Sequence, residues 1–232
     1  MSGQEQTRRE RHRRRTIEEI KSTAVAQVRE GGPEAVSFNA IARSMGMSAP
    51  ALYRYFDSRD ELLAELAADV HLDLAVALET AAAGAASPVA RVRAVAHGYR
   101  NWALSDPQSY RLAHGSTHGS GREHAADRIR PAALRSMTVL LTAVAEAGVP
   151  SGAPVPASLE KQVRRWNGGG GQQAFPPGVL HFGLVWWSRL HGLVSLELGQ
   201  HLTATGIDTG LLYRTEVEAM VGSLSHRYGA TA

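Results

Sequence analysis

The stretch from Ser37 to Leu63, SFNAIARSMGMSAPALYRYFDSRDELL, constrains the fold more than any other part of the chain. Its spacing predicts two short helices joined by a tight turn and followed at once by a third helix. Gly46 suits the turn because a residue without a Cβ reaches positive φ at little cost. Ser48 is placed to cap the next helix through its hydroxyl, and Pro50 is tolerated in a first turn. Helix, turn and helix in this order is the arrangement of a helix-turn-helix DNA reader.

A long helix should follow directly. Ser58 and Glu61 stand at the spacing of a capping box, so the helix is expected to begin near Arg59 and to run to about residue 83. A helix of that length spans tens of ångströms, which is enough to link two domains. We therefore interpret residues 63–84 as a connecting helix. Its inward stripe is predicted to consist of Leu62, Leu63, Leu66, Val70, Leu74 and Leu78.

The residues IARSMGMSAPALYRYFDSRDELL resemble the signature of the TetR family of bacterial transcriptional regulators. The resemblance is dense from Thr16 to Leu66, with one departure: Arg59 stands where the family usually has Lys, which changes the geometry of any phosphate contact. The resemblance implies an all-α protein. An N-terminal three-helix domain would carry the helix-turn-helix and bind DNA, and a C-terminal helical domain would bind a ligand and dimerise.

The second helix of the motif, predicted over residues 49–55, would enter the major groove. The resemblance implies that Tyr53, Tyr55 and Arg59 mostly meet the phosphate backbone, although the two tyrosines could instead belong to a small hydrophobic core. Arg54 is the only long, forked donor on this helix and could reach a guanine edge or a phosphate. Ser37 is expected to cap the preceding helix, and its backbone N–H to face a phosphate. The residues expected at DNA are Ser37, Ser48, Ala49, Pro50, Ala51, Tyr53, Arg54, Tyr55 and Arg59.

The net charge is concentrated in the segment suspected of touching DNA. Residues 1–60 contain 11 Lys and Arg against 8 Asp and Glu, whereas the remaining residues contain 14 of each. Residues 1–15 are rich in arginine and nearly free of apolar residues, which predicts a disordered basic arm. Such an arm could enter the minor groove or lie along phosphates, or it could be a solvated tail. Thr16 and Glu19 suggest a second capping box, so the DNA-binding domain is expected over residues 16–62.

The C-terminal domain is expected over residues 85–229. Ser87-Pro88 and Asp106-Pro107 are helix starts, and Pro131 should kink or divide a longer helix over about residues 123–147. Residues 149–178, rich in proline and glycine, predict a mobile loop in which KQVRRW could form a short helical turn. Two further helices are expected over about residues 179–202 and 208–228.

The segment Trp187-Ser-Arg-Leu-His191-Gly192 resembles the Trp-His-Gly class of C-terminal domains attached to such regulators. In this family the last two long helices pair with those of a second subunit, which implies a homodimer. Gly183, Gly192 and Ser195 would allow close approach of helices.

Large apolar and polar side chains on the predicted C-terminal helices could form a pocket for a small molecule. The alternative is an ordinary helical core, in which His191 is a buried, hydrogen-bonded histidine. The candidates are Tyr99, Trp102, Tyr110, Met137, Trp186, Trp187 and His191, with His97, Arg100 and Arg135 as further polar groups.

Several other classes of function have little support. The chain has no cysteine for disulfides or thiolate ligation, and no apolar run long enough to span a membrane, so a cytoplasmic protein is expected. His114, His118 and His124 are separated by glycines and accompanied by no fixed carboxylate, so no metal site is expected. The run Gly168–Gly171 lacks the Lys-Ser/Thr of a phosphate-binding loop, and no nucleophile elbow is present. We expect neither an enzyme nor a cofactor.

The sequence therefore predicts a transcriptional regulator, most simply a repressor that a small-molecule effector releases from a palindromic operator. Two alternatives remain open: a DNA-binding regulator whose C-terminal domain only dimerises, and a helical ligand-binding protein whose N-terminal domain is structural.

Overall fold

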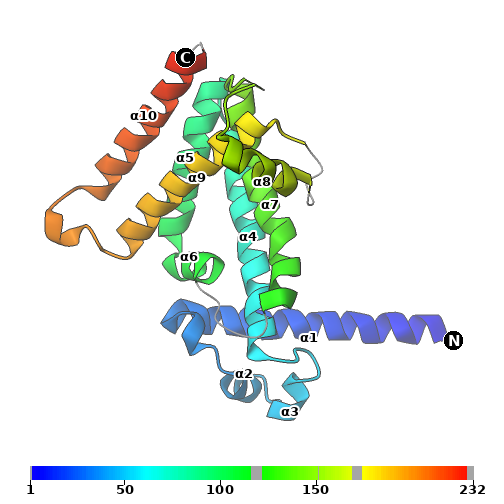
Figure 1. The fold of residues 1–232 in the computed structure, drawn as a ribbon. Coiled ribbons are helices and arrows are strands. Elements are labelled where there is room, and N and C mark those ends of the chain that lie inside the picture. Colours follow the sequence, from blue (N-terminus) through cyan, green and yellow to red (C-terminus); the bar gives the residue numbers. More distant parts are fainter. Residues whose placement is uncertain (1, 116–121, 151, 169–173, 229–232) are drawn as a thin grey trace. The chain divides into compact units, whose positions relative to one another are not determined.

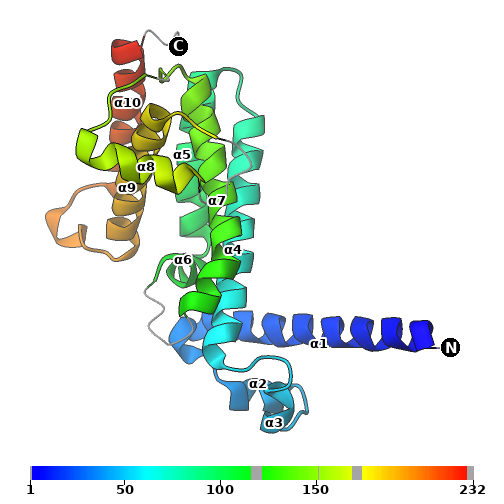
Figure 2. The ribbon, with the colours of Figure 1, turned by 45° about the vertical axis from the view of Figure 1, so that its right-hand side comes forward.

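The computed structural model describes residues 2–115, 122–150, 152–168 and 174–228, and every regular element in these ranges is a helix (Figures 1 and 2). This confirms the predicted all-α class. The chain forms two compact units: Met1–His71 with Asp106–Arg130, and Leu72–Ser105 with Pro131–Ala232. Within the described ranges, no helix is both long enough and apolar enough to cross a bilayer.

The first unit is built on α1 (Ser2–Gly31), which packs against η1 (Pro33–Ala35), α2 (Phe38–Ser44) and α6 (Pro107–His114). α2 packs in turn against α3 (Ala49–Leu52), and α4 (Arg59–Ala83) begins in this unit. The unit therefore includes α6 and the first turns of α7, which were expected in the C-terminal domain. Its buried apolar side chains include Ile20, Ala24, Val28, Phe38, Ile41, Leu52, Phe56, Leu62 and Leu66.

The predicted disorder of residues 1–15 is wrong for the described residues, because 2–15 are the first half of α1. Adding a turn to an existing helix costs far less than starting a new one, and arginine has a high helix propensity. Arg15 also pairs with Glu19 at the favourable i, i+4 spacing. The second capping box is wrong for the same reason: Thr16 lies inside α1 and its hydroxyl donates to the His12 carbonyl oxygen.

The turn between α2 and α3 has the predicted geometry at Gly46, whose φ is +65°. Ser37 caps α2 as expected, since its Oγ accepts the Ala40 N–H at 3.4 Å. Ser48 occupies the cap position of α3, but its hydroxyl makes no capping bond, contrary to expectation. α3 is also shorter than predicted, since it ends at Leu52 and its carbonyls are bonded by tighter turns through Phe56.

The start of α4 agrees closely with the predicted boundary. The Glu61 N–H donates to the Ser58 Oγ at 3.1 Å, which is one half of a capping box. The carboxylate of Glu61 accepts from the Asp57 N–H instead of the Ser58 N–H. α4 then runs from Arg59 to Ala83, as the sequence predicts.

The second unit contains the rest of α4 together with α5 (Pro88–Ser105), α8 (Ala157–Gly168), α9 (Pro177–Leu198), η2 (Thr203–Thr205) and α10 (Thr209–Tyr228). It also contains most of α7 (Arg122–Glu146), in which Pro131 stands inside one helix and does not divide it. α5, α9 and α10 pack against one another in pairs, and α8 packs against α9. The predicted caps hold, because Ser87 accepts the Ala90 N–H and Asp106, in the first unit, accepts the Ser109 N–H.

The predicted loop 149–178 is wrong over α8, which has twelve residues rather than a single turn. Val163 is buried, and Glu160 pairs with Arg164 one turn later, so packing and an i, i+4 ion pair both stabilise this helix. Gly168 is the last residue of α8, and the other glycines of the run Gly168–Gly171 lie outside the described residues, as do residues 172 and 173.

Candidate nucleic-acid interface

α3 and the turn that follows it separate buried anchors from exposed polar groups. Leu52 and Phe56 are buried at 0% and 3% exposure, whereas Tyr53 is 53% exposed and Arg54 is also exposed. Ser48 and Pro50 are exposed, and Ala49 and Ala51 are partly exposed. The structure thus presents most of the predicted DNA-contacting side chains on the solvent side of one short element.

Tyr53 is both packed against a neighbour and partly exposed. Its ring packs against Phe38 of α2, with ring centroids 5.1 Å apart, so it belongs to a small aromatic cluster. About half of the side chain nevertheless remains exposed. Packing fixes the ring, and a fixed, exposed phenol is suited to donate a hydrogen bond to a phosphate oxygen.

The guanidinium of Arg59, predicted to contact a phosphate, is hydrogen-bonded within the molecule. Its Nε donates to the Val36 carbonyl oxygen at 2.9 Å, and its Nη2 donates to the Pro33 carbonyl oxygen at 2.5 Å. The same guanidinium lies 3.8 Å from a carboxylate oxygen of Asp60. These bonds satisfy carbonyls around the end of η1, so Arg59 connects the start of α4 to the segment preceding α2.

The backbone N–H of Ser37, predicted to face a phosphate, is also used inside the molecule. It donates to the side-chain Oε1 of Gln27 on α1 at 2.8 Å. Ser37 is therefore bonded on both sides: its hydroxyl caps α2 and its amide joins α2 to α1.

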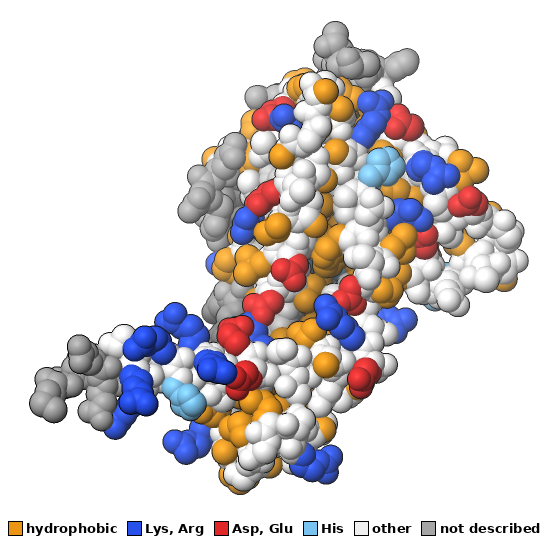
Figure 3. Space-filling view, turned by 180° about the vertical axis from the view of Figure 1, so that it is seen from behind, with side chains coloured by type: hydrophobic (Ala, Val, Ile, Leu, Met, Phe, Trp, Pro, Cys, Tyr) orange, Lys and Arg blue, Asp and Glu red, His pale blue; other side chains and the backbone are white. Residues whose placement is uncertain are grey.

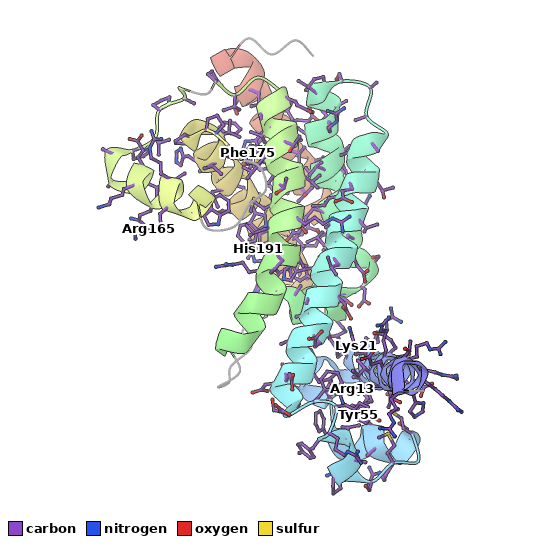
Figure 4. All side chains as sticks on the ribbon, turned by 90° about the vertical axis from the view of Figure 1, so that its right-hand side faces the viewer. Arg13, Lys21, Tyr55, Arg165, Phe175 and His191 are labelled. Carbon is purple, nitrogen blue, oxygen red and sulfur yellow. The ribbon has the colours of Figure 1, made fainter. Side chains whose placement is uncertain are left out.

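The N-terminal half of α1 carries the main concentration of positive charge in this unit (Figure 3). The exposed arginines there are Arg8, Arg9, Arg11, Arg13, Arg14 and Arg15. Arg13 differs from the others because it reaches the end of the segment formed by α3 and the turn after it, residues 49–55, which we call the recognition segment (Figure 4). One Nη atom donates to the Arg54 carbonyl oxygen at 3.0 Å, and the guanidinium lies 5.3 Å from the centroid of the Tyr55 ring.

No pattern in the sequence singles out Gln27 or Arg13. Their partners are 10 and 41 positions away, so no helical or strand periodicity connects them. The only signal for Arg13 was its place in an arginine-rich stretch, which does not distinguish it from its neighbours.

In the second unit, four of the predicted ligand residues are brought together between α5 and α9. The Tyr99 hydroxyl lies 3.0 Å from Nδ1 of His191, whose ring stacks on Trp187 at a centroid distance of 4.9 Å. Tyr99 in turn stacks loosely on Trp102, at 6.3 Å. Burial lowers the pKa of His191, which favours the neutral imidazole.

The other candidates do not join this aromatic group. Trp186 is buried and contacts Phe182, and Tyr110 belongs to the first unit, where its ring lies 4.8 Å from that of His114. Met137 is half-buried. Arg135 pairs with Glu79, while His97 lies 6.1 Å from Tyr213.

Arg100 is held in a partly buried ion pair rather than left open for a ligand. It bonds Glu197 through two nitrogen atoms, which raises the pKa of the guanidinium and lowers the pKa of the carboxylate. A pocket of about 390 Å³ opens beside this pair, where Leu196, Glu197 and Ile207 are among the lining residues. None of the seven predicted ligand residues lines it.

Of the three histidines considered for a metal site, the structure describes the side chain of only His114. The side chains of His118 and His124 are not among the described residues, and His114 contacts the rings of His71 and Tyr110. Among the side chains that are described, no three His, Cys, Asp or Glu residues cluster as metal ligands would.

Two models of protein families match this chain, one in its N-terminal part and one in its C-terminal part. Residues 20–66 match the family model described as bacterial regulatory proteins, tetR family. Residues 92–220 match the model described as tetracyclin repressor-like, C-terminal domain. The first match contains α2, α3 and the Arg59 contacts, and the second contains α9 and most of α5 and α10.

Curated relatives cover nearly the same length. The HTH-type transcriptional regulators Mb1846 of Mycobacterium bovis and Rv1816 of Mycobacterium tuberculosis are each 31% identical over 95% of this chain and 98% of their own. Among solved structures, the protein SCO4313 is 37% identical, with a TM-score of 0.69 over 92% of this chain and 98% of its own. A protein from Rhodococcus sp. RHA1 shares the fold at 23% identity, with a TM-score of 0.66 over 89% of this chain and 94% of its own.

Proposed function

Since the chain belongs to the tetR family of bacterial regulatory proteins, we propose that it is a repressor that binds a palindromic operator as a homodimer and is released by a small molecule. It is a transcriptional regulator and not an enzyme. Since its proposed partner is DNA, we infer that it acts in the bacterial cytoplasm.

The exposed Tyr53 and Arg54, held over the buried anchors Leu52 and Phe56, carry the proposal for DNA recognition. Arg54 would read a guanine edge or contact a phosphate, and Tyr53 would bond a phosphate oxygen. Ser48, Pro50 and the two alanines would lie against the groove, where the methyl groups of Ala49 and Ala51 could meet thymine methyls. In a dimer, two such segments would require half-sites about one helical turn apart, ~34–36 Å.

The homodimer would form through the outer faces of α9 and α10. Large apolar side chains are exposed there, including Val185 at 39% and Leu211 at 55%. Gly192 and Gly222 have open space where a Cβ would stand, so a second backbone could approach them closely. Gly183, also predicted for close approach, is instead used within the chain, because an added Cβ would meet Leu141 of α7.

The effector would bind in the second unit near the aromatic group of Tyr99, Trp102, Trp187 and His191. Stacked rings beside a neutral imidazole favour a flat, mostly apolar ligand with at least one hydrogen-bonding group. Binding would release the operator only if the ligand prefers the state that does not bind DNA, and the difference in affinity sets the size of the effect. A domain that only dimerises remains the competing interpretation.

The proposal is tested by selecting operators from a random DNA pool with the full-length protein, followed by footprinting across a salt series. Enrichment of a palindrome protected by one dimer is the expected result. Failure to enrich any sequence would overturn the proposal of specific binding. A thermal-shift screen of planar aromatic compounds then tests the effector, since a ligand that binds the folded state raises the melting temperature. A true effector must also release the selected operator.

A further inference from the structure

We propose that Arg13 is a positioning residue that holds the end of the recognition segment in place, rather than one more phosphate contact in the basic stretch of α1. The inference rests on the proposed operator binding and adds a residue that determines its specificity. Its basis is the pair of contacts that Arg13 makes with the two residues following Tyr53.

The recognition segment needs support from outside itself. α3 has four residues, so it is shorter than any helix that is stable alone in water, and residues 53–55 continue it only as turns. The carbonyls of Ala51 and Leu52 are bonded by N–H groups of these turns, whereas the Arg54 carbonyl oxygen lies beyond them and accepts from Arg13. A guanidinium at this end is therefore favourable.

Arg13 comes from an element that can supply that support. It precedes the fully buried Ile20 by about two turns of α1, and so shares the inward face of that helix. From there it donates to the Arg54 carbonyl oxygen at 3.0 Å and covers the Tyr55 ring at 5.3 Å. One side chain thus fixes the backbone of Arg54 and the ring of the next residue (Figure 4).

The consequence concerns where the Arg54 side chain points. Base readout by a forked donor depends on its direction, because a bidentate bond to a guanine requires both nitrogen atoms to be in place. Phosphate contacts carry no sequence information, so they contribute equally to specific and non-specific binding. Loss of Arg13 should therefore weaken specific binding more than non-specific binding.

Arg9 provides the matched control. It lies one turn before Arg13 on the same helix, is also exposed, and makes no hydrogen bond or ion pair among the described residues. Because Arg9 has no partner of this kind to position in the described part of the chain, we expect it to act on DNA through its own charge. Its removal should change binding to every sequence by a common factor.

The experiment measures dissociation constants of the wild type, Arg13→Ala, Arg13→Lys and Arg9→Ala for the selected operator and for a scrambled duplex. Circular dichroism melting first establishes that each variant is folded. We expect Arg13→Ala to lose roughly tenfold in the ratio of specific to non-specific affinity, in line with a charge-assisted hydrogen bond and an exposed cation–π contact. Arg13→Lys keeps the charge, so it should bind scrambled DNA as the wild type does and still lose part of the ratio.

A double-mutant cycle with Tyr55→Leu completes the test. If Arg13 acts through Tyr55 and its neighbour, the double variant should lose little more specificity than Arg13→Ala alone. The proposal is overturned if Arg13→Ala behaves as Arg9→Ala does, weakening both duplexes by one factor with a smaller salt slope. Additive losses in the cycle would also overturn it. A wild type that enriches no operator would instead contradict the proposed function.

Discussion

The Nε atom of Arg59 donates a hydrogen bond at 2.9 Å to the carbonyl oxygen of Val36, a residue 23 positions earlier in the chain. The bond joins the first residue of α4 to the segment that leads into α2, with α2 and α3 between them in sequence. Arg59, which was predicted to contact DNA, therefore also joins two parts of the first unit.

Arg59→Ala should lower the free energy of unfolding by about 1–2 kcal/mol, because two carbonyls lose a charged donor in a partly exposed place. The salt slope of DNA binding should stay at the wild-type value, since no phosphate contact is removed. Urea unfolding and a salt titration of operator binding measure the two effects. A slope reduced by ~0.9 with unchanged stability would restore the phosphate interpretation.

Tyr53→Phe separates the ring of Tyr53 from its hydroxyl. The ring still packs on Phe38, so the melting temperature should remain within about one degree of the wild type, because surface changes of this kind rarely affect stability. Affinity for all DNA sequences should fall by a few-fold, since an exposed hydrogen bond to phosphate contributes about 1 kcal/mol. If the wild type and Tyr53→Phe bind DNA with equal affinity, Tyr53 contributes through packing alone.

Leu211→Lys should shift the protein from dimer toward monomer, because it places a charge on the apolar surface of α10. Val76→Lys is the control: Val76, on α4, is 50% exposed against 55% for Leu211, but it lies outside the proposed interface. Sedimentation equilibrium of both variants measures the effect. The proposed interface on α9 and α10 would be wrong if Val76→Lys dissociates the dimer and Leu211→Lys does not.

Stability should fall on acidification below about pH 6.5, the ordinary pKa of histidine. Burial lowers the pKa of His71, and burial also lowers the pKa values of His97 and His191. In the window between the lowered pKa and the ordinary one, the unfolded chain binds more protons than the folded protein, so stability decreases as pH falls.

His71→Gln should remove part of this dependence. Melting temperatures of the variant and the wild type, compared between pH 7.5 and 5.5, test the assignment. The variant should lose less stability than the wild type over this range. Parallel curves would show that the titration of His71 is not coupled to folding.

Local signals in the sequence predicted much of the fold. The cap at Ser58, the proline at residue 88 and the positive φ at Gly46 each depend on a few neighbouring residues, and each was found where expected. The separation of buried Leu52 from exposed Tyr53 also follows from local helical geometry.

The predictions that were wrong or incomplete depend on contacts between residues that are distant in the sequence. Composition predicted disorder before Thr16, but a helix already formed downstream extends through the arginines at low cost. The helix α8 depends on the burial of Val163 within a proline- and glycine-rich region. The roles of Arg59 and Gln27 depend on carbonyl and amide groups brought close only by the folded chain.

The four-residue length of α3 has a consequence for engineering new operator preferences. Transplanting residues 37–56 alone into another regulator would move the side chains proposed to face the groove. It would leave behind Gln27, which bonds Ser37, and Arg59, which joins the start of α4 to Val36. The segment that must be transplanted together is therefore larger than the helix-turn-helix: it begins within α1 and ends after the first turn of α4.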